Sequence, residues 1–185
     1  MHRICVFTGS NNGTRDEYAA SARILGHELA ARDIGLVYGG GDVGLMGIIA
    51  DAALAAQGEV FGVIPNALMD RELGHAGVTK LYIVDSMHTR KARMAELSDG
   101  FIALPGGFGT LEELFEVITW AQLEFHSKPV GLLNVGGFYD HLLEFLSHVK
   151  TEGFVKKRHH DILMVDQSPG DLIDRMTARA LILRE

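Results

Sequence analysis

The chain has 185 residues, of which 47% are apolar and 22% are charged, an ordinary balance for a globular protein. A chain of this length can bury a substantial core without disulfides or metals, so we expect one domain over residues 1–185. The formal net charge is −7, and no long basic run offsets it, which argues against a nucleic-acid partner.

The lone cysteine and the N-terminal segment bear on the cellular compartment. Cys5 lies in an apolar strand pattern, so we expect a small core residue rather than a nucleophile. The residues after Met1 enter this strand directly, without the apolar stretch of a signal peptide. No run approaches the roughly 20 apolar residues that span a bilayer. We expect a cytoplasmic protein with no membrane partner.

Short apolar runs alternate with segments of helical periodicity along the chain. The runs predict strands at Arg3–Phe7, Leu36–Tyr38, Val60–Ile64, Lys80–Val84, Phe101–Leu104, Val130–Leu133 and Ile162–Val165. The segments between them predict helices near Arg15–Arg32, Leu45–Gln57, Met87–Leu97, Leu111–Phe125, Tyr139–Lys150 and Gly170–Leu183. Strands that are apolar on both faces are typical of a parallel sheet covered by helices. We therefore expect a single α/β domain: a Rossmann-like, doubly wound parallel sheet with helices on both faces, whose strand order the pattern does not give.

Three glycine-rich segments follow predicted strands, at residues 8–13, 39–44 and 105–110. In open α/β sheets, ligands bind beyond the carboxyl ends of the strands, where loops turn into helices. Glycine lets the backbone approach a ligand, and the free N–H groups of the next helix can hold an anion. One such loop also fits a simple tight turn, but three at one edge of a sheet predict a phosphate site.

The second of these loops matches a dinucleotide-binding pattern. Gly39, Gly41 and Gly44 satisfy G-x-G-x-x-G between a strand and a helix. Such sites also place an acidic residue at the end of the next strand, whereas Glu59 lies at the start of that strand. We interpret the loop as a close-packed turn that can contact a phosphate or sugar, not as an NAD site.

Metal and hydrolase motifs do not account for the remaining polar residues. The sequence has nine histidines but no H-E-x-x-H pattern, and it has no G-x-S-x-G nucleophile elbow. His159 and His160 fall in a polar segment that we expect to be a loop. We expect surface or packing roles for the histidines and no metal site.

The third glycine loop leads into a helix. Gly106, Gly107 and Gly109 expose backbone donors before a helix N-terminus, which suits a phosphate dianion. Thr110 and Glu113 have the T-x-x-E spacing of a capping box, in which each side chain satisfies a backbone donor. A capping box alone does not need the glycines, and the cap and a phosphate cradle can coexist.

A basic pair near the start of another helix is the second feature that points to an anion. Asp85 or Ser86 is a candidate N-cap, which places Arg90 and Lys91 in the early turns. Cations there oppose the helix dipole at a cost of up to about 1 kcal/mol. A solvated basic pair is the alternative, but a bound anion explains the placement. We expect Arg90 to serve the anion rather than the fold.

Together, these two segments resemble the signature of a known family. Met87-His88-x-Arg90-Lys91, followed by Pro105-Gly106-Gly107-x-Gly109-Thr110-x-x-Glu113, is similar to the motifs of the Lonely Guy family. These proteins are cytokinin riboside 5′-monophosphate phosphoribohydrolases, often mislabelled lysine decarboxylases. The resemblance covers nearly the whole chain. It implies a homodimeric enzyme that releases a free base, an N6-modified adenine, and ribose 5-phosphate from a nucleoside 5′-monophosphate.

The resemblance also implies roles for individual residues. Arg90 and Glu113 match the catalytic pair of the family. The implied substrate contacts are Gly9, Ser10, Glu72, Met87, Arg90, Lys91, Gly106, Gly107, Gly109, Thr110, Glu113 and Thr119. The family often carries cysteine before the first Gly-Ser, where this chain has Thr8, so the sequence departs from the family at that position.

The residue types agree with this chemistry. Cleavage of a ribosyl C1′–N9 bond passes through an oxocarbenium-like state, which a carboxylate such as Glu113 can stabilise while it orients water. Arginine almost never gives up its proton, so we expect Arg90 to bind phosphate or stabilise charge rather than act as an acid. This scheme requires no metal and no organic cofactor.

Two alternatives remain open. A nucleotide 5′-monophosphate nucleosidase of broader base preference, acting for example on AMP, would share these residues. A binding protein like the molybdenum cofactor carriers would hold a ligand without turnover, although the presence of both Arg90 and Glu113 favours an enzyme. A pyridoxal-dependent decarboxylase is not expected, because no lysine lies in a recognisable cofactor motif.

Overall fold

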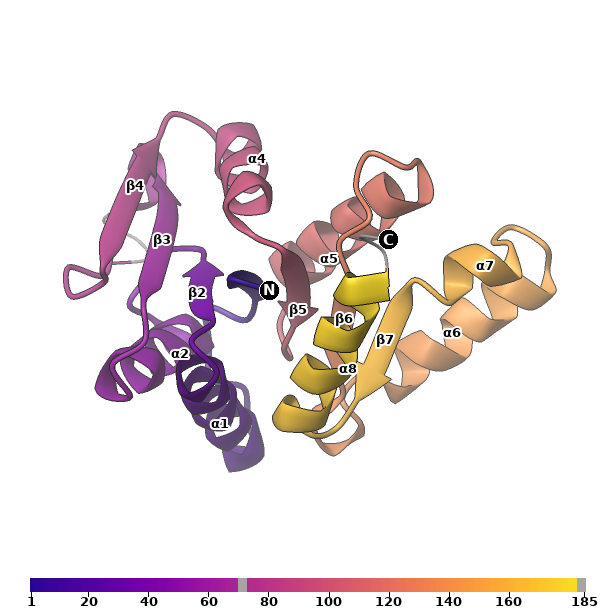
Figure 1. Ribbon diagram of the computed structural model, residues 1–185, viewed down its shortest axis with the longest axis horizontal. Coiled ribbons are helices and arrows are strands. Elements are labelled where there is room, and N and C mark those ends of the chain that lie inside the picture. The colour runs from indigo at the N-terminus through magenta and orange to yellow at the C-terminus, as the bar shows by residue number, and fades with distance from the viewer. Residues whose placement is uncertain (70–72, 183–185) are drawn as a thin grey trace.

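A computed structural model describes residues 1–69 and 73–182, and within them seven strands form one sheet (Figure 1). The order is β4-β3-β2-β1-β5-β6-β7, and each neighbouring pair is parallel. The strands are β1 Arg3–Phe7, β2 Gly35–Tyr38, β3 Val60–Pro65, β4 Lys80–Val84, β5 Gly100–Ala103, β6 Val130–Leu133 and β7 Leu163–Asp166. The predicted doubly wound α/β sheet is confirmed.

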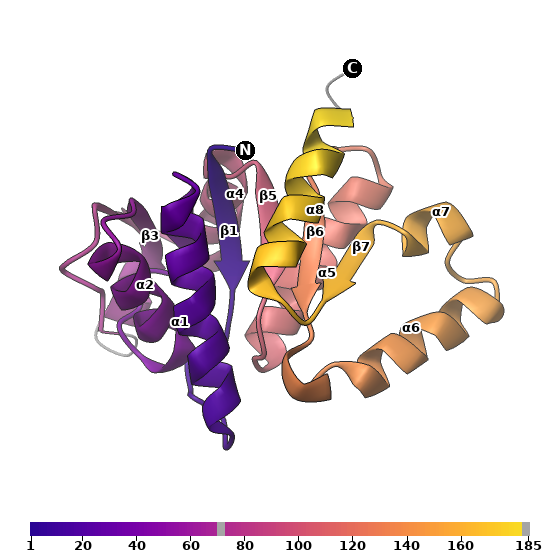
Figure 2. The same ribbon diagram turned by 60° about the horizontal axis from the view of Figure 1, so that its bottom comes forward.

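Helices cover both faces of this sheet. They are α1 Asp16–Ala31, α2 Gly44–Ala55, α4 Met87–Leu97, α5 Phe108–Gln122, α6 Asp140–Thr151, α7 Lys157–His160 and α8 Pro169–Ile182, with 3₁₀ turns η1 Asn66–Leu68 and η2 Val135–Gly137. Apolar side chains of α1, α2 and α8 fill one core, and those of α4 and α5 fill the other. Figure 2 shows α6 and α7 extending away from the sheet beside β7. Among the described helices, none is long and apolar enough to cross a membrane.

Cys5 lies in the middle of β1, the central strand. It is fully buried among side chains that include Phe7 and Phe101, as predicted for a core residue. Burial raises the pKa of the Cys5 thiol, and the negative charge of Glu113 raises this pKa further. A thiol in this state is not a nucleophile.

Two local predictions are wrong. Helix α5 begins at Phe108, with Gly107 as its N-cap, so Thr110 lies inside the first turn and does not form a capping box with Glu113. The apolar periodicity starts only at Leu111 because Phe108 and Gly109 are exposed and Thr110, although buried, is polar. The segment expected to be a polar loop around His159 forms the single turn of α7.

Close contact between α1 and α2 depends on small residues. At Gly26 of α1, an added Cβ would lie 2.7 Å from the carbonyl oxygen of Ile49 and 2.9 Å from Cβ of Ala52. Both of these atoms belong to α2, and the former is backbone that cannot move aside. In contrast, an added Cβ at Gly109, near the start of α5, meets no atom within 4 Å.

This difference predicts opposite effects of the same substitution on stability. Gly26→Ala should lower the free energy of unfolding by about 1–3 kcal/mol, because it overpacks the interface between the two helices. Gly109→Ala should leave it unchanged or raise it by up to about 1 kcal/mol, because alanine favours a helix. Urea denaturation without ligand measures both, and equal stabilities would contradict the packing argument.

Candidate functional site

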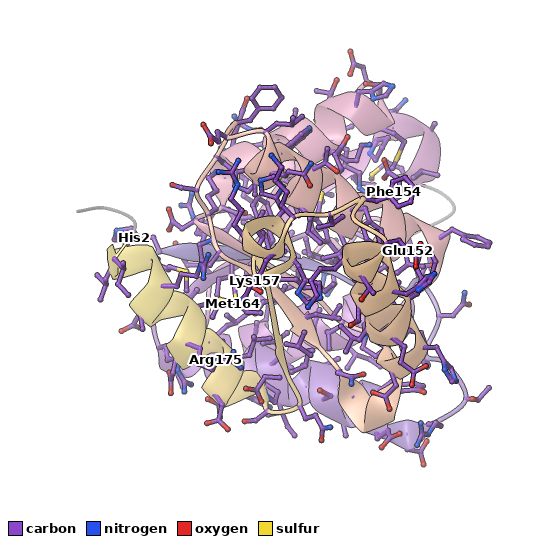
Figure 3. The ribbon with its side chains drawn as sticks, turned by 90° about the vertical axis from the view of Figure 1, so that its right-hand side faces the viewer. His2, Glu152, Phe154, Lys157, Met164 and Arg175 are labelled. Carbon is purple, nitrogen blue, oxygen red and sulfur yellow. The ribbon has the colours of Figure 1, made fainter. Side chains whose placement is uncertain are left out.

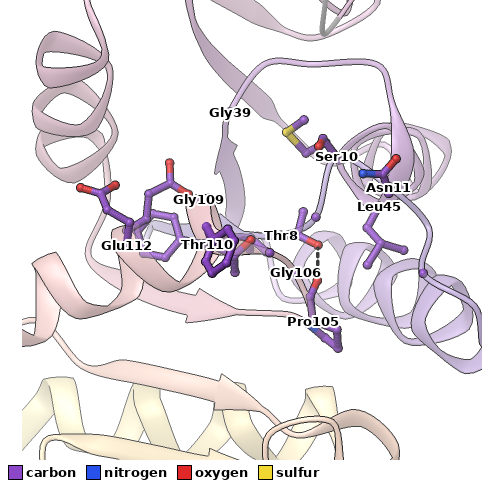
Figure 4. A pocket seen from close by; sticks show the side chains of 18 of the residues that line it. Thr8, Ser10, Asn11, Gly39, Leu45, Pro105, Gly106, Gly109, Thr110 and Glu112 are labelled. Atoms are coloured by element: carbon purple, nitrogen blue, oxygen red, sulfur yellow. Dashed lines mark hydrogen bonds between the residues drawn. The ribbon is translucent and has the colours of Figure 1, made fainter. Parts of the chain in front are cut away.

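The strand order reverses at β1, which pairs with β2 on one side and β5 on the other. A cavity of about 430 Å³ lies beyond the carboxyl ends of β1 and β5, where sheets of this type bind ligands. Figure 4 shows the loops after these two strands meeting at Thr8 and Pro105. Residues of α4 and α5 complete the lining.

Most of the predicted site residues line this one cavity. They are Gly9, Ser10, Met87, Arg90, Gly106, Gly107, Gly109, Thr110 and Glu113. Thr119 does not line it: this residue is exposed further along α5, and its hydroxyl donates to the carbonyl of Phe115 at 2.7 Å. The prediction for Glu72 lies outside the described residues.

Lys91 is placed between two helices rather than in the cavity. Its Nζ lies 2.5 Å from Oε1 of Glu112 and 3.0 Å from Oε1 of Glu116, both on α5. Desolvation alone would lower the pKa of Lys91, but the hydrogen bonds to these carboxylates raise it above its usual value. Lys91 therefore ties α4 to α5 next to the site.

The first and third glycine loops are joined by their backbones. The N–H of Gly9 donates to the carbonyl of Pro105 at 3.2 Å, and the hydroxyl of Thr8 reaches the same carbonyl at 3.5 Å (Figure 4). Thr8, where the family often has cysteine, thus adds a polar link between the two loops. At Gly106, an added Cβ would clash with the side chain of Thr110 and would lie 2.9 Å from the nitrogen of Gly9, so both the start of α5 and the close approach of the loops require glycine here.

The second glycine loop is a close-packed turn, as interpreted from the sequence. The N–H of Leu45, in the first turn of α2, donates to the carbonyl of Gly9 at 3.1 Å. Gly44 has φ +57°, and an added Cβ there would clash with the backbone of Ser10 and Asn11. Because protein atoms occupy the start of α2, this helix does not offer the pyrophosphate seat of a dinucleotide site.

The N-terminus of α5, in contrast, faces the cavity. The first N–H groups of a helix have no partner within the helix, and here they belong to Phe108, Gly109 and Thr110. An added Cβ at Gly107 or Gly109 would meet no atom within 4 Å. Packing of this chain therefore does not explain these two glycines, whereas a ligand lying against the backbone does.

Arg90 is 5% exposed and reaches across the sheet edge from α4. Its Nε donates to the carbonyl of Val63 at 3.1 Å, and its Nη2 donates to the carbonyl of Gly39 at 2.8 Å. Ser86 caps the same helix by accepting from the N–H of Thr89 at 3.1 Å. The sequence predicts that Arg90 serves an anion rather than the fold, but its side chain also joins α4 to β3 and to the loop after β2.

Known proteins resemble this chain over almost its full length. Residues 46–176 match the family model described as "Possible lysine decarboxylase". The chain is 51% identical to "Probable cytokinin riboside 5′-monophosphate phosphoribohydrolase LOGL2" of Oryza sativa subsp. japonica, over 95% of this chain and 72% of that protein. It is 50% identical to "Cytokinin riboside 5′-monophosphate phosphoribohydrolase LOG3" of Arabidopsis thaliana, over 95% and 82%. The chain belongs to this phosphoribohydrolase family.

Solved structures of lower sequence identity share the fold. The molybdenum cofactor binding protein of Rippkaea orientalis superposes with a TM-score of 0.71 at 24% identity, covering 95% of each chain. The molybdenum cofactor carrier protein of Chlamydomonas reinhardtii gives a TM-score of 0.72 at 20% identity, over 97% of this chain and 98% of that one. At this level of identity, the similarity to these structures shows that the fold is shared and says nothing of the ligand.

The sequence did not predict the aromatic residues that line the cavity of this phosphoribohydrolase. Phe108 is 93% exposed at the start of α5, and Tyr18 and Phe138 form an edge-on pair with ring centroids 5.6 Å apart. The turn Gly136-Gly137-Phe138 follows β6 at the same edge of the sheet, so a glycine pair after a strand could have signalled Phe138. No comparable signal marks Tyr18, which lies within α1.

The contacts of Arg90 predict a loss of stability when its side chain is removed. Arg90→Ala leaves the carbonyls of Val63 and Gly39 buried without this donor, which should lower the free energy of unfolding by about 2–5 kcal/mol. Arg93→Ala, on the same helix, removes a partly exposed side chain that lies over the ring of Tyr82 and pairs with Glu96, and should change it by less than about 1 kcal/mol. Chemical denaturation without nucleotide measures both variants. An Arg90→Ala protein as stable as Arg93→Ala would show that these bonds contribute little.

Proposed function

We propose that this chain is a single nucleotide-binding domain that hydrolyses the N-glycosidic bond of an N6-modified adenosine 5′-monophosphate. The products are the free base, a cytokinin, and ribose 5-phosphate. One observation carries the proposal: Arg90 and Glu113 line the cavity that the uncapped N-terminus of α5 faces. Relatives about 50% identical to the chain are named for the same reaction, which supports the proposal.

The 5′-phosphate would bind at the start of α5. Backbone N–H groups there point toward the ligand, and the helix dipole favours a negative charge. Among the described residues that line the cavity, Arg90 is the only lysine or arginine, and its guanidinium also holds two carbonyl groups. The phosphate seat therefore consists mainly of backbone, with Gly107 and Gly109 leaving room for the anion.

Glu113 would act on the ribose, one turn further along α5. As the C1′–N9 bond breaks, its electrons leave with the base and positive charge develops on the sugar, which a carboxylate stabilises. The oxygen of water adds to C1′ and one of its protons goes to Glu113, while the released base takes a proton from solvent at its nitrogen. Glu113 then gives its proton back to solvent, which restores the carboxylate. Arg90 supplies a fixed positive charge that needs no reorganisation during the reaction, because its position is set by the carbonyls that it binds.

The proposal includes a homodimer, as the family resemblance implies, and a cytoplasmic location; both stay predictions. Exposed apolar side chains at one end of the molecule support a partner surface. Phe154, between α6 and α7, is 84% exposed (Figure 3), and Phe145 projects from α6, a helix in which no residue is fully buried.

The phosphate seat predicts that nucleosides are poor substrates. We expect kcat/KM for AMP or N6-isopentenyl-AMP to exceed that of the matching nucleoside at least about 100-fold, the loss expected when a charged binding group is missing. Gly109→Ala places a methyl group in the seat and should lower kcat/KM about tenfold or more while stability is kept. Release of base and ribose 5-phosphate measures turnover.

Three other outcomes of this assay would contradict the proposal in different ways. Equal kcat/KM for adenosine and AMP would show that the start of α5 does not bind the 5′-phosphate. Equal kcat/KM for AMP and N6-isopentenyl-AMP would indicate the nucleosidase of broader base preference. Binding of nucleotide without release of base would indicate a carrier.

Glu113→Gln tests the carboxylate directly. The substitution keeps the size of the side chain but removes its charge, so we expect kcat to fall at least about 100-fold with little change in melting temperature. Glu112→Gln is the matched control on the same turn, because that carboxylate is exposed and pairs with Lys91. It should keep kcat within about threefold, because Lys91 retains its bond to Glu116 and so continues to join α4 to α5. Near-normal turnover of Glu113→Gln would assign catalysis to another group.

A further inference from the structure

A cluster of polar side chains lies outside the cavity, beside the second glycine loop. His75 is 7% exposed, and its Nε2 lies 3.1 Å from Oδ1 of Asp51 on α2 and 3.8 Å from Oδ1 of Asp42 in the loop. None of these three residues belongs to the predicted site. One histidine and two carboxylates this close together could form either a metal site or a hydrogen-bonded link between α2, the second glycine loop and the segment that carries His75; we call such a link a tie.

The second ring nitrogen of His75 decides between these two interpretations. The N–H of Gly77 donates to Nδ1 at 3.1 Å, so Nδ1 carries no proton in this arrangement. Nε2 therefore carries the ring proton of the neutral imidazole and donates it to Asp51. A metal at Nε2 would displace that proton, and Nδ1 would then face a donor instead of the acceptor that metal-binding histidines use. The cluster is a hydrogen-bonded tie.

The backbone around His75 reinforces this tie. The N–H of His75 donates to the carbonyl of Gly40 at 2.9 Å, and the N–H of Asp42 donates to the carbonyl of Leu73 at 3.0 Å. Gly41 and Gly74 form an isolated antiparallel bridge. The segment from residue 73 to residue 77 is thus bonded to the second glycine loop by its backbone and to α2 by its side chain.

The glycine loop in turn holds Arg90. Gly39 accepts the 2.8 Å bond from Nη2 of Arg90, and the next residue, Gly40, accepts the bond from His75. There is little free space at this point, because an added Cβ at Gly39 would lie 3.1 Å from Sδ of Met46. A shift of Gly40 therefore moves the carbonyl of Gly39 and the guanidinium group bound to it.

We propose that His75 is a positioning residue of the hydrolase site: its bond to Asp51 holds the loop at Gly39 and Gly40, and so fixes the guanidinium group of Arg90 in the cavity. The inference rests on the proposed function for its effect on turnover. The effect on Arg90 itself is independent of that function and can be measured separately.

Two substitutions of His75 separate its two side-chain bonds. His75→Asn offers an oxygen in place of Nδ1 and can keep the bond from Gly77, but it is too short to reach Asp51. His75→Gln places an amide nitrogen near the position of Nε2 and can keep the bond to Asp51. We expect His75→Asn to lower kcat about tenfold with KM changed less than about threefold, because a misplaced charge affects mainly the transition state. His75→Gln should keep kcat within about threefold.

Asp51 provides the matching half of the test. Asp51→Ala should lower kcat as much as His75→Asn does. The double variant should lose no more kcat than either single variant, because the two substitutions remove the same bond. Asp51→Asn keeps an acceptor and should retain most of the activity. His27→Asn, at an exposed position on α1, is the control for a histidine substitution elsewhere. Melting temperatures establish that each variant is folded at the assay temperature.

The state of Arg90 is followed by NMR through hydrogen exchange at its Nε–H, which donates to Val63. Exchange should be at least about tenfold faster in His75→Asn than in wild type or His75→Gln, if opening of this contact becomes easier. Unchanged exchange and unchanged kcat in folded His75→Asn would overturn the proposal, as would additive losses in the double variant. If the wild-type protein itself releases no base, the proposed function fails, and the exchange measurement alone decides the role of His75.

Discussion

The position of β1 between β2 and β5 is the constraint from which the rest of the site follows. Crossovers between parallel strands are right-handed, so the chain that leaves β1 and the chain that leaves β5 pass to opposite faces of the sheet. Their loops separate beyond the strand ends, and backbone there lines a cavity instead of packing against a helix. The bond from Gly9 to Pro105 sets how far these loops separate, and the absence of a side chain at Gly106 permits it.

Arg90 and Lys91 are neighbours in sequence, but they contribute to the site in different ways. Each lies near the positive end of α4, where a cation costs up to about 1 kcal/mol. For Arg90, hydrogen bonds from a charged donor to two buried carbonyls offset this cost, since each contributes about 1.5–3 kcal/mol. For Lys91, the ion pairs with two carboxylates of α5 offset the same cost. Both cations near the cavity are therefore held in place by other groups of the protein, which suits a phosphate site that consists mainly of backbone N–H groups.

The sequence predicts the fold well because the apolar runs of the strands are short and alternate with segments of helical periodicity. Each of the seven strands lies within a residue or two of its predicted place. Most of the site residues that the sequence predicts do line the cavity, because glycine loops that follow neighbouring strands lie at one edge of the sheet. It fails where a local pattern has two solutions: the spacing of Thr110 and Glu113 fits a capping box, but the helix starts one turn earlier. It does not predict that Lys91 and Thr119 lie outside the cavity lining, because the orientation of these side chains depends on how α4 and α5 pack. The tie between His75 and Asp51 joins residues 24 apart and leaves no local pattern.

The single thiol at the centre of the sheet has a practical consequence. Thiol reagents attack the thiolate, and Cys5 is both fully enclosed in β1 and disfavoured as a thiolate by burial. Because the Cys5 side chain lies in the core between the sheet and helices α4 and α5, access to it requires these helices to leave the sheet, which opens one of the two cores of the molecule. The rate of alkylation at this atom therefore reports the opening of this core in the native protein, without added dyes or engineered labels.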